Sequence, residues 1–331
     1  MDRRSWLLLV LLASIWGASY MLIKIGLRDL SPEMVAFARI ALAAVVLMPI
    51  AAAQGALRGL RGRLGVIVLV GAIQVAGPFW LIPAGEQEIS SALAGILVAT
   101  TPIFTALLAI RVDHEERSEG MRLAGVGIGV AGVVVLFGLD LTGSSAAVFG
   151  GLAVVLAGLG YSIGGFIVKH RLSGARPLGV VASVMTASAV LLLIPAVLSA
   201  PSSAPGLGPL AAVAALGVFG TGAAFVIFYL LIGTIGPART MIVSYLAPGF
   251  AVVYGATLLS ESITFGTVLG LALIVGGSWL AAGGLAAPPA RTTPAEAPPL
   301  PACEAAAIPD SAPRRASDGA HRESRRHAST R

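Results

Sequence analysis

The chain has 331 residues, of which 56% are hydrophobic and 11% are charged, and its formal net charge is +6. Soluble proteins carry about 25% charged residues, so this composition excludes an ordinary soluble domain and predicts a membrane protein. The single cysteine, Cys303, excludes an intrachain disulfide and a cysteine-rich metal site.

Ten apolar stretches follow one another along the chain, separated by short loops. A transmembrane helix needs roughly 20 mainly apolar residues. In hydrocarbon every backbone amide must find a partner within the protein, which favours helices. The predicted spans are approximately 6–27, 33–53, 65–84, 91–110, 121–138, 147–168, 178–199, 209–232, 238–259 and 264–285. We therefore expect an all-α integral membrane protein with ten transmembrane helices.

The first span also resembles a signal peptide, because Arg3 and Arg4 precede an apolar run. The apolar character continues to Ile25, however, which is longer than the apolar region of a cleaved signal. We expect this segment to be retained as the first helix.

Two basic residues lie within the first two spans, Lys24 near the end of one and Arg39 about two turns into the other. A charge in hydrocarbon usually faces a cavity or a partner. Both are therefore candidate substrate-binding residues. For Lys24 the alternative is snorkelling to the interface. For Arg39 it is a structural ion pair with Glu33, Glu86 or Glu88.

An acidic segment, Glu86-Gln87-Glu88, follows the third span. We expect it to be an exposed loop, and the alternative is a cation-attracting vestibule. Trp16 lies nearer the middle of its span than an interfacial tryptophan would, which favours the wall of a pocket. Trp80 is a second tryptophan candidate for the cavity.

Two prolines, Pro102 and Pro248, stand in the middle of the fourth and ninth spans. Each is expected to bend its helix and free a carbonyl. Matching interruptions in two halves of a chain point to a transporter's binding site, although a plain packing kink is an equal alternative. Thr101 and Tyr245 beside them are candidate cavity residues.

Two enzyme-like motifs occur in the wrong context. Gly127–Gly132 spells a dinucleotide fingerprint and Gly160–Gly164 a hydrolase nucleophile elbow, yet both lie inside predicted spans. Small residues four apart, such as Gly125 and Gly129, instead allow helix backbones to approach closely. We therefore expect no enzyme activity, no cofactor and no metal, and energy that comes from a gradient or a partner.

The second half of the chain repeats the first. Corresponding landmarks are Ser91, Pro102, Glu116 and Gly132 in the first half, and Pro237, Pro248, Glu261 and Gly277 in the second. Because each copy holds five spans, the second copy must enter the membrane inverted, and inverted repeats usually enclose a substrate path. The predicted domains are a first repeat over 1–139, a second over 140–286 and a tail over 287–331.

Basic residues indicate the orientation. With the N-terminus in the cytoplasm, the only basic residue in the outer loops is Arg28. The cytoplasmic set is Arg3, Arg4, Arg58, Arg61, Arg63, Arg111, Arg117, Arg122, Lys169, Arg171, Arg176 and Arg239. The positive-inside rule therefore places both termini in the cytoplasm of a plasma-membrane protein. No aromatic residues interleave with the loop arginines, so nucleic acid is not an expected partner.

The tail beyond about residue 286 is rich in Pro, Ala, Ser and Arg and almost lacks large apolar residues. Such a segment cannot bury enough surface to offset its ordering entropy, so we expect it to be disordered. The alternative is that its arginines dock on anionic lipid.

These residues together resemble the EamA-type repeat of the drug/metabolite transporter superfamily. The opening of that repeat is matched by Trp16-Gly17, Lys24, Pro32 and Arg39, and its closing half by Thr101-Pro102, Glu116 and Gly125, with Ala247-Pro248, Glu261 and Gly270 as a second copy. In the second copy Tyr161 and Lys169 match Trp16 and Lys24, but Val184 stands where Arg39 is expected. The resemblance implies a central cavity between the repeats and alternating access.

The expected function is a secondary transporter that exports a small metabolite such as an amino acid. Alternatives are efflux of drugs or cationic compounds and, less favoured, a channel or a membrane-receptor subunit. The expected partners are the small-molecule substrate and the lipid bilayer, and oligomeric state, a homodimer included, stays open. The candidate substrate-binding residues are Trp16, Lys24, Arg39, Trp80, Thr101, Tyr161 and Tyr245.

Overall fold

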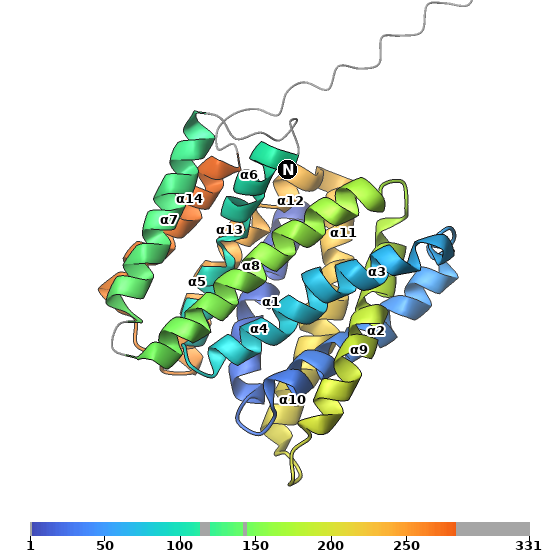
Figure 1. The fold of residues 1–331 in the computed structure, drawn as a ribbon, viewed down its shortest axis with the longest axis horizontal. Helices are drawn as coiled ribbons and strands as arrows, with labels where there is room; N and C mark the ends of the chain where they lie inside the picture. The colour runs from blue at the N-terminus through green and yellow to red at the C-terminus, as the bar shows by residue number, and fades with distance from the viewer. Residues whose placement is uncertain (1, 113–119, 142–143, 283–331) are drawn as a thin grey trace, which may run out of the picture. The chain divides into compact units, whose positions relative to one another are not determined.

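The computed structural model describes residues 2–112, 120–141 and 144–282, and within these ranges it contains helices and turns but no strand (Figure 1). The predicted tail lies outside the described residues. The helices of the first half are α1 (Arg3–Gly26), α2 (Pro32–Ala53), η1 (Arg61–Arg63), α3 (Leu64–Val70), η2 (Gly71–Ala76), α4 (Gly77–Glu86), α5 (Ser91–Val98), α6 (Thr101–Val112) and α7 (Met121–Leu139). Those of the second are α8 (Ser145–Arg171), α9 (Pro177–Leu198), α10 (Leu207–Ala215), η4 (Leu216–Ala223), α11 (Ala224–Ile235), α12 (Pro237–Thr240), α13 (Val243–Leu258) and α14 (Phe265–Ala281).

These elements form the ten predicted spans. Eight helical stretches of the described residues are long and apolar enough to cross a membrane, including the composite stretches Arg61–Glu86, Ser91–Ala109 and Leu207–Ile235. The shorter apolar helices α13 and α14 complete the ten. The predicted all-α, ten-helix architecture of two inverted repeats is therefore confirmed. One boundary was wrong, because the span predicted over 238–259 is divided between α12 and α13.

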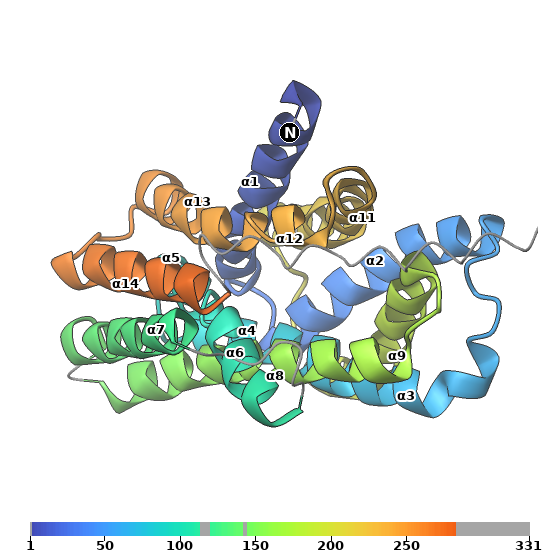
Figure 2. The ribbon, with the colours of Figure 1, turned by 90° about the horizontal axis from the view of Figure 1, so that it is seen from above.

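The two halves are interlocked rather than separate. The helix α7 packs along α14, α2 along α9, and α1 along α13, so each pair takes one helix from each half. The first of these pairs lies to one side of the bundle, as Figures 1 and 2 show. The contact between the halves therefore runs the length of the helices.

Glycines allow the closest of these contacts. A Cβ atom added at Gly277 of α14 would collide with the backbone N and Cα of Gly129 of α7, and one at Gly125 would collide with Ala281 N. The prediction that Gly125 and Gly129 serve helix packing is confirmed. The glycines that resemble a dinucleotide-binding fingerprint in this segment therefore serve close helix packing.

The fourth span is broken between α5 and α6, and hydroxyl groups satisfy the carbonyls that the break releases. Thr100 Oγ1 donates to Leu97 O (2.7 Å) and Thr101 Oγ1 to Val98 O (2.8 Å). Ser278 Oγ of α14 donates to Ala99 O (2.6 Å), which brings in the second half. A buried carbonyl without such a donor would cost about 1–3 kcal/mol.

The predicted equivalence of the two prolines was wrong in detail. Pro102 lies in the first turn of α6, where the missing N–H costs nothing, directly after the break at Ala99 and Thr100. Pro248 lies inside α13, and the corresponding break comes earlier, at Met241 and Ile242. The interruptions of the two halves are therefore at different depths.

A better-matched irregularity is a pair of π-helical segments, η2 and η4, in the third and eighth spans. They begin at Gly71 and Leu216, and the same interval separates Trp16 from its repeat counterpart Tyr161. A π-helix is rare and frequently occurs at functional sites. These segments are the symmetric interruptions that the prolines were expected to provide.

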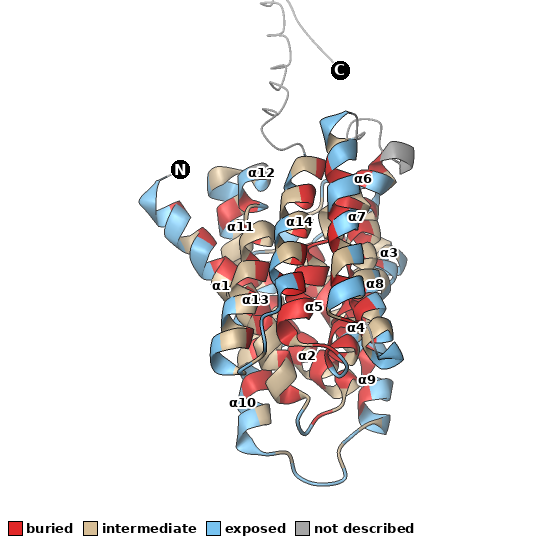
Figure 3. Cartoon of the chain, turned by 90° about the vertical axis from the view of Figure 1, so that its left-hand side faces the viewer, coloured by how far each residue is buried: buried red, intermediate tan, exposed pale blue. Residues whose placement is uncertain are grey.

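Many large apolar residues are exposed on the outside of the bundle, as in a protein surrounded by lipid. Val45, Phe149 and Val190 are about two-thirds exposed or more, at 70%, 71% and 67%. Soluble monomers rarely expose such wide apolar areas. The first turns of α1 are also exposed, and Figure 3 shows them leaning away from the neighbouring helices.

Candidate functional site

Arg39 lies inside the bundle, on the face of α2 that packs against η4. Its side chain is 6% exposed. Its Nε–H donates to Thr221 Oγ1 (3.2 Å), and its guanidinium carbon lies 4.1 Å from the centre of the Phe79 ring. Such a cation–π contact contributes about 2 kcal/mol when it is desolvated. Thr221 Oγ1 donates in turn to Leu216 O (3.1 Å), the carbonyl five residues earlier in the π-helical segment.

Aromatic residues from other elements complete this group. The rings of Phe79 and Tyr161 are 6.3 Å apart in an edge-to-face arrangement. Tyr20 and Tyr161 lie close to Arg39. We call Tyr20, Arg39, Phe79, Tyr161 and Thr221 the Arg39 cluster. It unites α1, α2, α4, α8 and η4, and hence both repeats.

Glu86 lies at the end of α4, in the neighbourhood of Arg39, Lys24 and Glu261. Its side chain is 0% exposed, and neither carboxylate oxygen has a hydrogen-bond partner among the described residues. The expectation of an exposed acidic loop holds for Gln87 and Glu88 but was wrong for Glu86.

The burial of Glu86 has a local cause. A Cβ atom at the preceding residue, Gly85, would come within 2.6 Å of Gly150 O and of Val154 Cγ2 on α8. The end of α4 therefore packs closely against α8, next to the buried Glu86.

Lys24 does not snorkel away from the protein. Its amine donates to the carbonyl oxygens of Glu86 and Ile89, the second at 2.8 Å. A cation is favourable at this position because the C-terminus of a helix carries partial negative charge. Lys24 therefore ties the end of α1 to the end of α4. We call this side of the bundle, where α1 and α4 end and α5 begins, the Lys24 end.

Glu261, which the sequence offered only as a repeat landmark, joins the two halves at the same end. Its carboxylate accepts from Ser91 N (2.8 Å), Ser91 Oγ (3.0 Å) and Ala92 N (3.1 Å) at the start of α5. The preceding Ser260 has φ of +57°, a left-handed conformation that non-glycine residues seldom adopt. The backbone turns sharply there to present Glu261. Its repeat counterpart, Glu116, lies outside the described residues.

We expect Glu261→Ala to lower the free energy of unfolding by about 2 kcal/mol, because it removes an N-terminal cap and leaves two buried amides without an acceptor. Thermal unfolding of the purified protein in detergent checks this. Glu88→Ala, which alters an exposed acidic residue nearby, is the matched control. Equal melting temperatures for both variants would contradict the capping role.

The remaining predicted residues lie elsewhere. Trp16 packs against Phe225 and Phe228 of α11, with 5.4 Å between the ring centres of Trp16 and Phe228. Trp80 is 39% exposed, and its Nε1–H donates to Glu33 Oε1 (2.9 Å). Glu33, one of the three acidic residues considered as an ion-pair partner of Arg39, thus bonds Trp80.

Thr101 and Tyr245 are half-buried. The Thr101 hydroxyl donates to Val98 O at the helix break, and the Thr101 carbonyl accepts from Ser162 Oγ (2.9 Å). Ser162 lies inside α8 and not on the sharp turn that a nucleophile elbow requires. Of the seven predicted residues, the structure brings Arg39 and Tyr161 into one group and places Lys24 next to it. Tyr20, Phe79 and Thr221 were missed, because nothing in their sequence context separates them from ordinary core residues.

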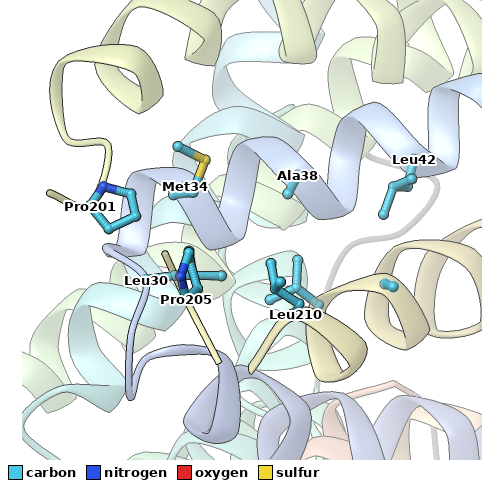
Figure 4. Close-up of a pocket in the computed structure, with 9 residues that line it drawn as sticks. Leu30, Met34, Ala38, Leu42, Pro201, Pro205 and Leu210 are labelled. Carbon is cyan, nitrogen blue, oxygen red and sulfur yellow. The ribbon is translucent and has the colours of Figure 1, made fainter. Parts of the chain in front are cut away.

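An apolar groove lies between α2 and α10 at the Lys24 end (Figure 4). Its volume is about 310 Å³, and it is lined by Leu30, Met34, Ala38, Leu42, Pro201, Pro205, Leu210, Val213 and Ala214. No polar side chain contributes to this lining. The groove therefore offers nothing that would orient a polar substrate, and the Arg39 cluster is the better candidate.

The model of the EamA-like transporter family matches residues 4–138 and 148–283. The chain belongs to the EamA-like transporter family. It is thus a multi-pass membrane transporter of the drug/metabolite transporter type, and family members are transporters rather than enzymes. The two matches fall within the predicted repeats 1–139 and 140–286.

Curated relatives carry transporter names. The chain is 28% identical over 267 residues to the uncharacterized inner membrane transporter YedA of Escherichia coli K12, covering 79% of this chain and 85% of that protein. It is also 28% identical over 309 residues to a protein of the same strain named "probable amino-acid metabolite efflux pump", covering 86% and 97%. A Streptantibioticus cattleyicolor protein named "probable terminal-alkyne amino-acid exporter" is 27% identical over 256 residues, covering 76% and 84%.

A solved crystal structure is similar to the chain with a TM-score of 0.59, over 85% of this chain and 98% of that one. Its sequence identity is 22%, so the likeness concerns the fold. Together with the family match, it agrees with the ten-helix arrangement described above.

Proposed function

We propose that this EamA-family protein exports a small carboxylate-bearing metabolite, an amino acid, by alternating access, and that Arg39 binds the substrate carboxylate. The observation that carries the proposal is the buried guanidinium held between Thr221 and Phe79, at the junction of both repeats. Two relatives named for amino-acid efflux and export support the substrate class.

Arg39 is suited to this task by its chemistry. A guanidinium stays protonated and binds carboxylates through parallel N–H groups. Thr221 accepts from its Nε–H, and in the part of the chain that the structure describes the terminal nitrogens make no hydrogen bond and can bind a ligand. Tyr20, Phe79 and Tyr161 supply aromatic surface beside it, and small-molecule sites typically combine such surface with few polar anchors.

The orientation follows from charge. The end of the bundle opposite Lys24 carries the basic residues Arg58, Arg63, Arg171 and Arg176. We therefore assign that end, with both termini, to the cytoplasm. The Lys24 end then faces outward. Its contacts from Lys24 to Ile89, from Ser91 to Glu261 and from Gly206 to Asp29 hold that end together. Export requires these contacts to open.

Binding is tested by thermal unfolding of the purified protein in detergent against amino acids, nucleosides, sugars and cationic drugs. A ligand at about 100 times its dissociation constant adds about 2.7 kcal/mol to the apparent stability. We expect stabilisation by amino acids, followed by exchange of labelled for unlabelled amino acid in proteoliposomes. Stabilisation by cationic drugs alone would favour the multidrug alternative, and silence across the panel would count against a substrate of either class.

A further inference from the structure

We propose that a pocket at the end of the bundle opposite Lys24 binds the phosphodiester group of an anionic phospholipid, with Arg58 and Arg176 as the residues that hold it. The pocket has a volume of about 550 Å³ and lies between the turn that follows α2 and the turn that precedes α9. The inference goes beyond the proposed function, because it concerns a lipid that stays bound and not the metabolite that is carried.

The two turns that form the pocket pack closely against each other. A Cβ atom added at Gly179, in the first turn of α9, would collide with the carbonyl oxygen of Ala56 in the turn after α2. Ala56, Leu60 and Leu172 are buried in the same core cluster. One turn belongs to each repeat, so a ligand in this pocket contacts both halves of the chain.

Both guanidinium groups approach the same turn of the backbone. Arg176 Nη1 donates to the carbonyl oxygen of Gln54 (2.6 Å), the residue at which α2 ends. The next residue, Gly55, has φ of +62°, and a Cβ atom there would lie 3.7 Å from Arg58 Nε. The two arginines therefore meet at one edge of the pocket, and a guanidinium presents five N–H groups in a fork that matches phosphate oxygens.

The described carboxylates do not compete for this position. They lie at the Lys24 end, namely Asp29, Glu33, Glu86, Glu88, Asp140 and Glu261, apart from Asp2, which accepts from Ser5 N at the start of α1. The helix α9 begins without a capping side chain, and its N-terminus adds partial positive charge beside the pocket. The site therefore favours an anion.

The surface next to the pocket favours a lipid as the source of that anion. Ala52 and Ala53 line the pocket and are exposed, and Val45 and Pro49 extend the same exposed face of α2 toward the middle of the membrane. Residues three and four apart share one face of a helix. A headgroup held by Arg58 and Arg176 can therefore lay its acyl chains along this apolar face. Basic pockets between transmembrane helices on the cytoplasmic side are typical sites for anionic lipid headgroups.

The test measures which lipid the purified, full-length protein retains. Phosphatidylglycerol and phosphatidylcholine are added in equal amounts to the protein in a neutral detergent, and native mass spectrometry counts the lipids that stay bound. Each arginine should contribute about fivefold to the preference for phosphatidylglycerol, because a basic residue near the membrane surface contributes about 1 kcal/mol. Arg58→Gln should therefore lose about fivefold of that preference, and the double variant Arg58→Gln, Arg176→Gln about 25-fold.

The matched control is Arg4→Gln with Arg239→Gln, which removes the same charge from exposed residues outside the pocket. This control should keep the preference of the wild type. The single variant Arg58→Gln removes no side-chain hydrogen bond among the described residues, so it tests the site even where the double variant is unstable. Equal preference in the control and in both pocket variants would overturn the inference.

A second arm separates the lipid from a soluble phosphate. Glycerophosphoglycerol carries the headgroup of phosphatidylglycerol without its acyl chains. We expect it to leave the bound phosphatidylglycerol in place, because the chains on α2 contribute to binding. Displacement of the lipid by this compound at equal concentration would assign the pocket to a soluble phosphodiester and overturn the lipid assignment.

Discussion

Arg39→Ala is expected to reduce amino-acid exchange by about 100-fold or more while the protein still inserts and folds. Truncating one partner of a buried, hydrogen-bonded charge pair costs about 3 kcal/mol, which corresponds to about 100-fold in affinity. Among the described residues, both oxygens of Glu86 lack a hydrogen-bond partner, so the substitution takes no partner away from that carboxyl group. Its removal eliminates a buried charge, which offsets the loss of the cation–π contact with Phe79, so the melting temperature should change little.

Two further variants separate binding from structure. Arg39→Lys keeps the charge but not the paired N–H groups, so it should restore little exchange. Thr221→Val removes the hydroxyl that orients Arg39 and should weaken exchange less than Arg39→Ala does. A collapse of stability in Arg39→Ala would assign the residue to structure, and normal exchange would remove it from the site.

The fold was largely readable from the sequence because its determinants are long and repeated. Apolar stretches of about 20 residues can only be satisfied as helices in a bilayer. The landmarks from Ser91 to Gly132 recur from Pro237 to Gly277, which made the inverted repeat visible. The glycines of the fifth span were also understood correctly, since close helix packing needs small residues at fixed spacing.

The π-helical segments could not be predicted in this way. A shift of the backbone hydrogen bonds from four to five residues leaves the hydropathy of η2 and η4 unchanged. Thr221 consequently gave no sign that it would face Arg39, although its hydroxyl bonds both Arg39 and Leu216. The sequence indicated helix interruptions only through its prolines, and Pro248 lies inside the helix α13 rather than at a break.

The candidate site was only partly predictable because burial depends on how helices approach one another. A loop position and an acidic neighbourhood suggested an exposed Glu86, whereas Glu86 is fully buried where α4 packs closely against α8. Depth along the first span suggested the wall of a pocket for Trp16, but the sequence did not indicate that its ring contacts Phe225 and Phe228. Arg39 was identified because a charge in hydrocarbon is expensive wherever it points.

Substitutions at two adjacent glycines of α14, Gly276 and Gly277, should separate effects on stability from effects on transport most clearly. We expect Gly277→Ala to lower the free energy of unfolding by about 3 kcal/mol, the upper range for overpacking, because its Cβ would collide with the backbone of Gly129. Backbone atoms cannot move aside as a flexible side chain can. Gly276→Ala, whose Cβ would meet no atom within 4 Å, should instead raise stability by about 0.5–1 kcal/mol through helix propensity.

Thermal unfolding in detergent measures both changes, and the opposite signs make the pair its own control. The helices α7 and α14 contribute no residue to the Arg39 cluster, so Gly277→Ala should bind amino acids normally at temperatures where it remains folded. Equal stability of the two variants would mean that α7 and α14 separate readily. Their contact would then belong to the moving parts of the transporter, whereas a large penalty at Gly277 alone would mark the pair as the fixed frame against which the Arg39 cluster opens.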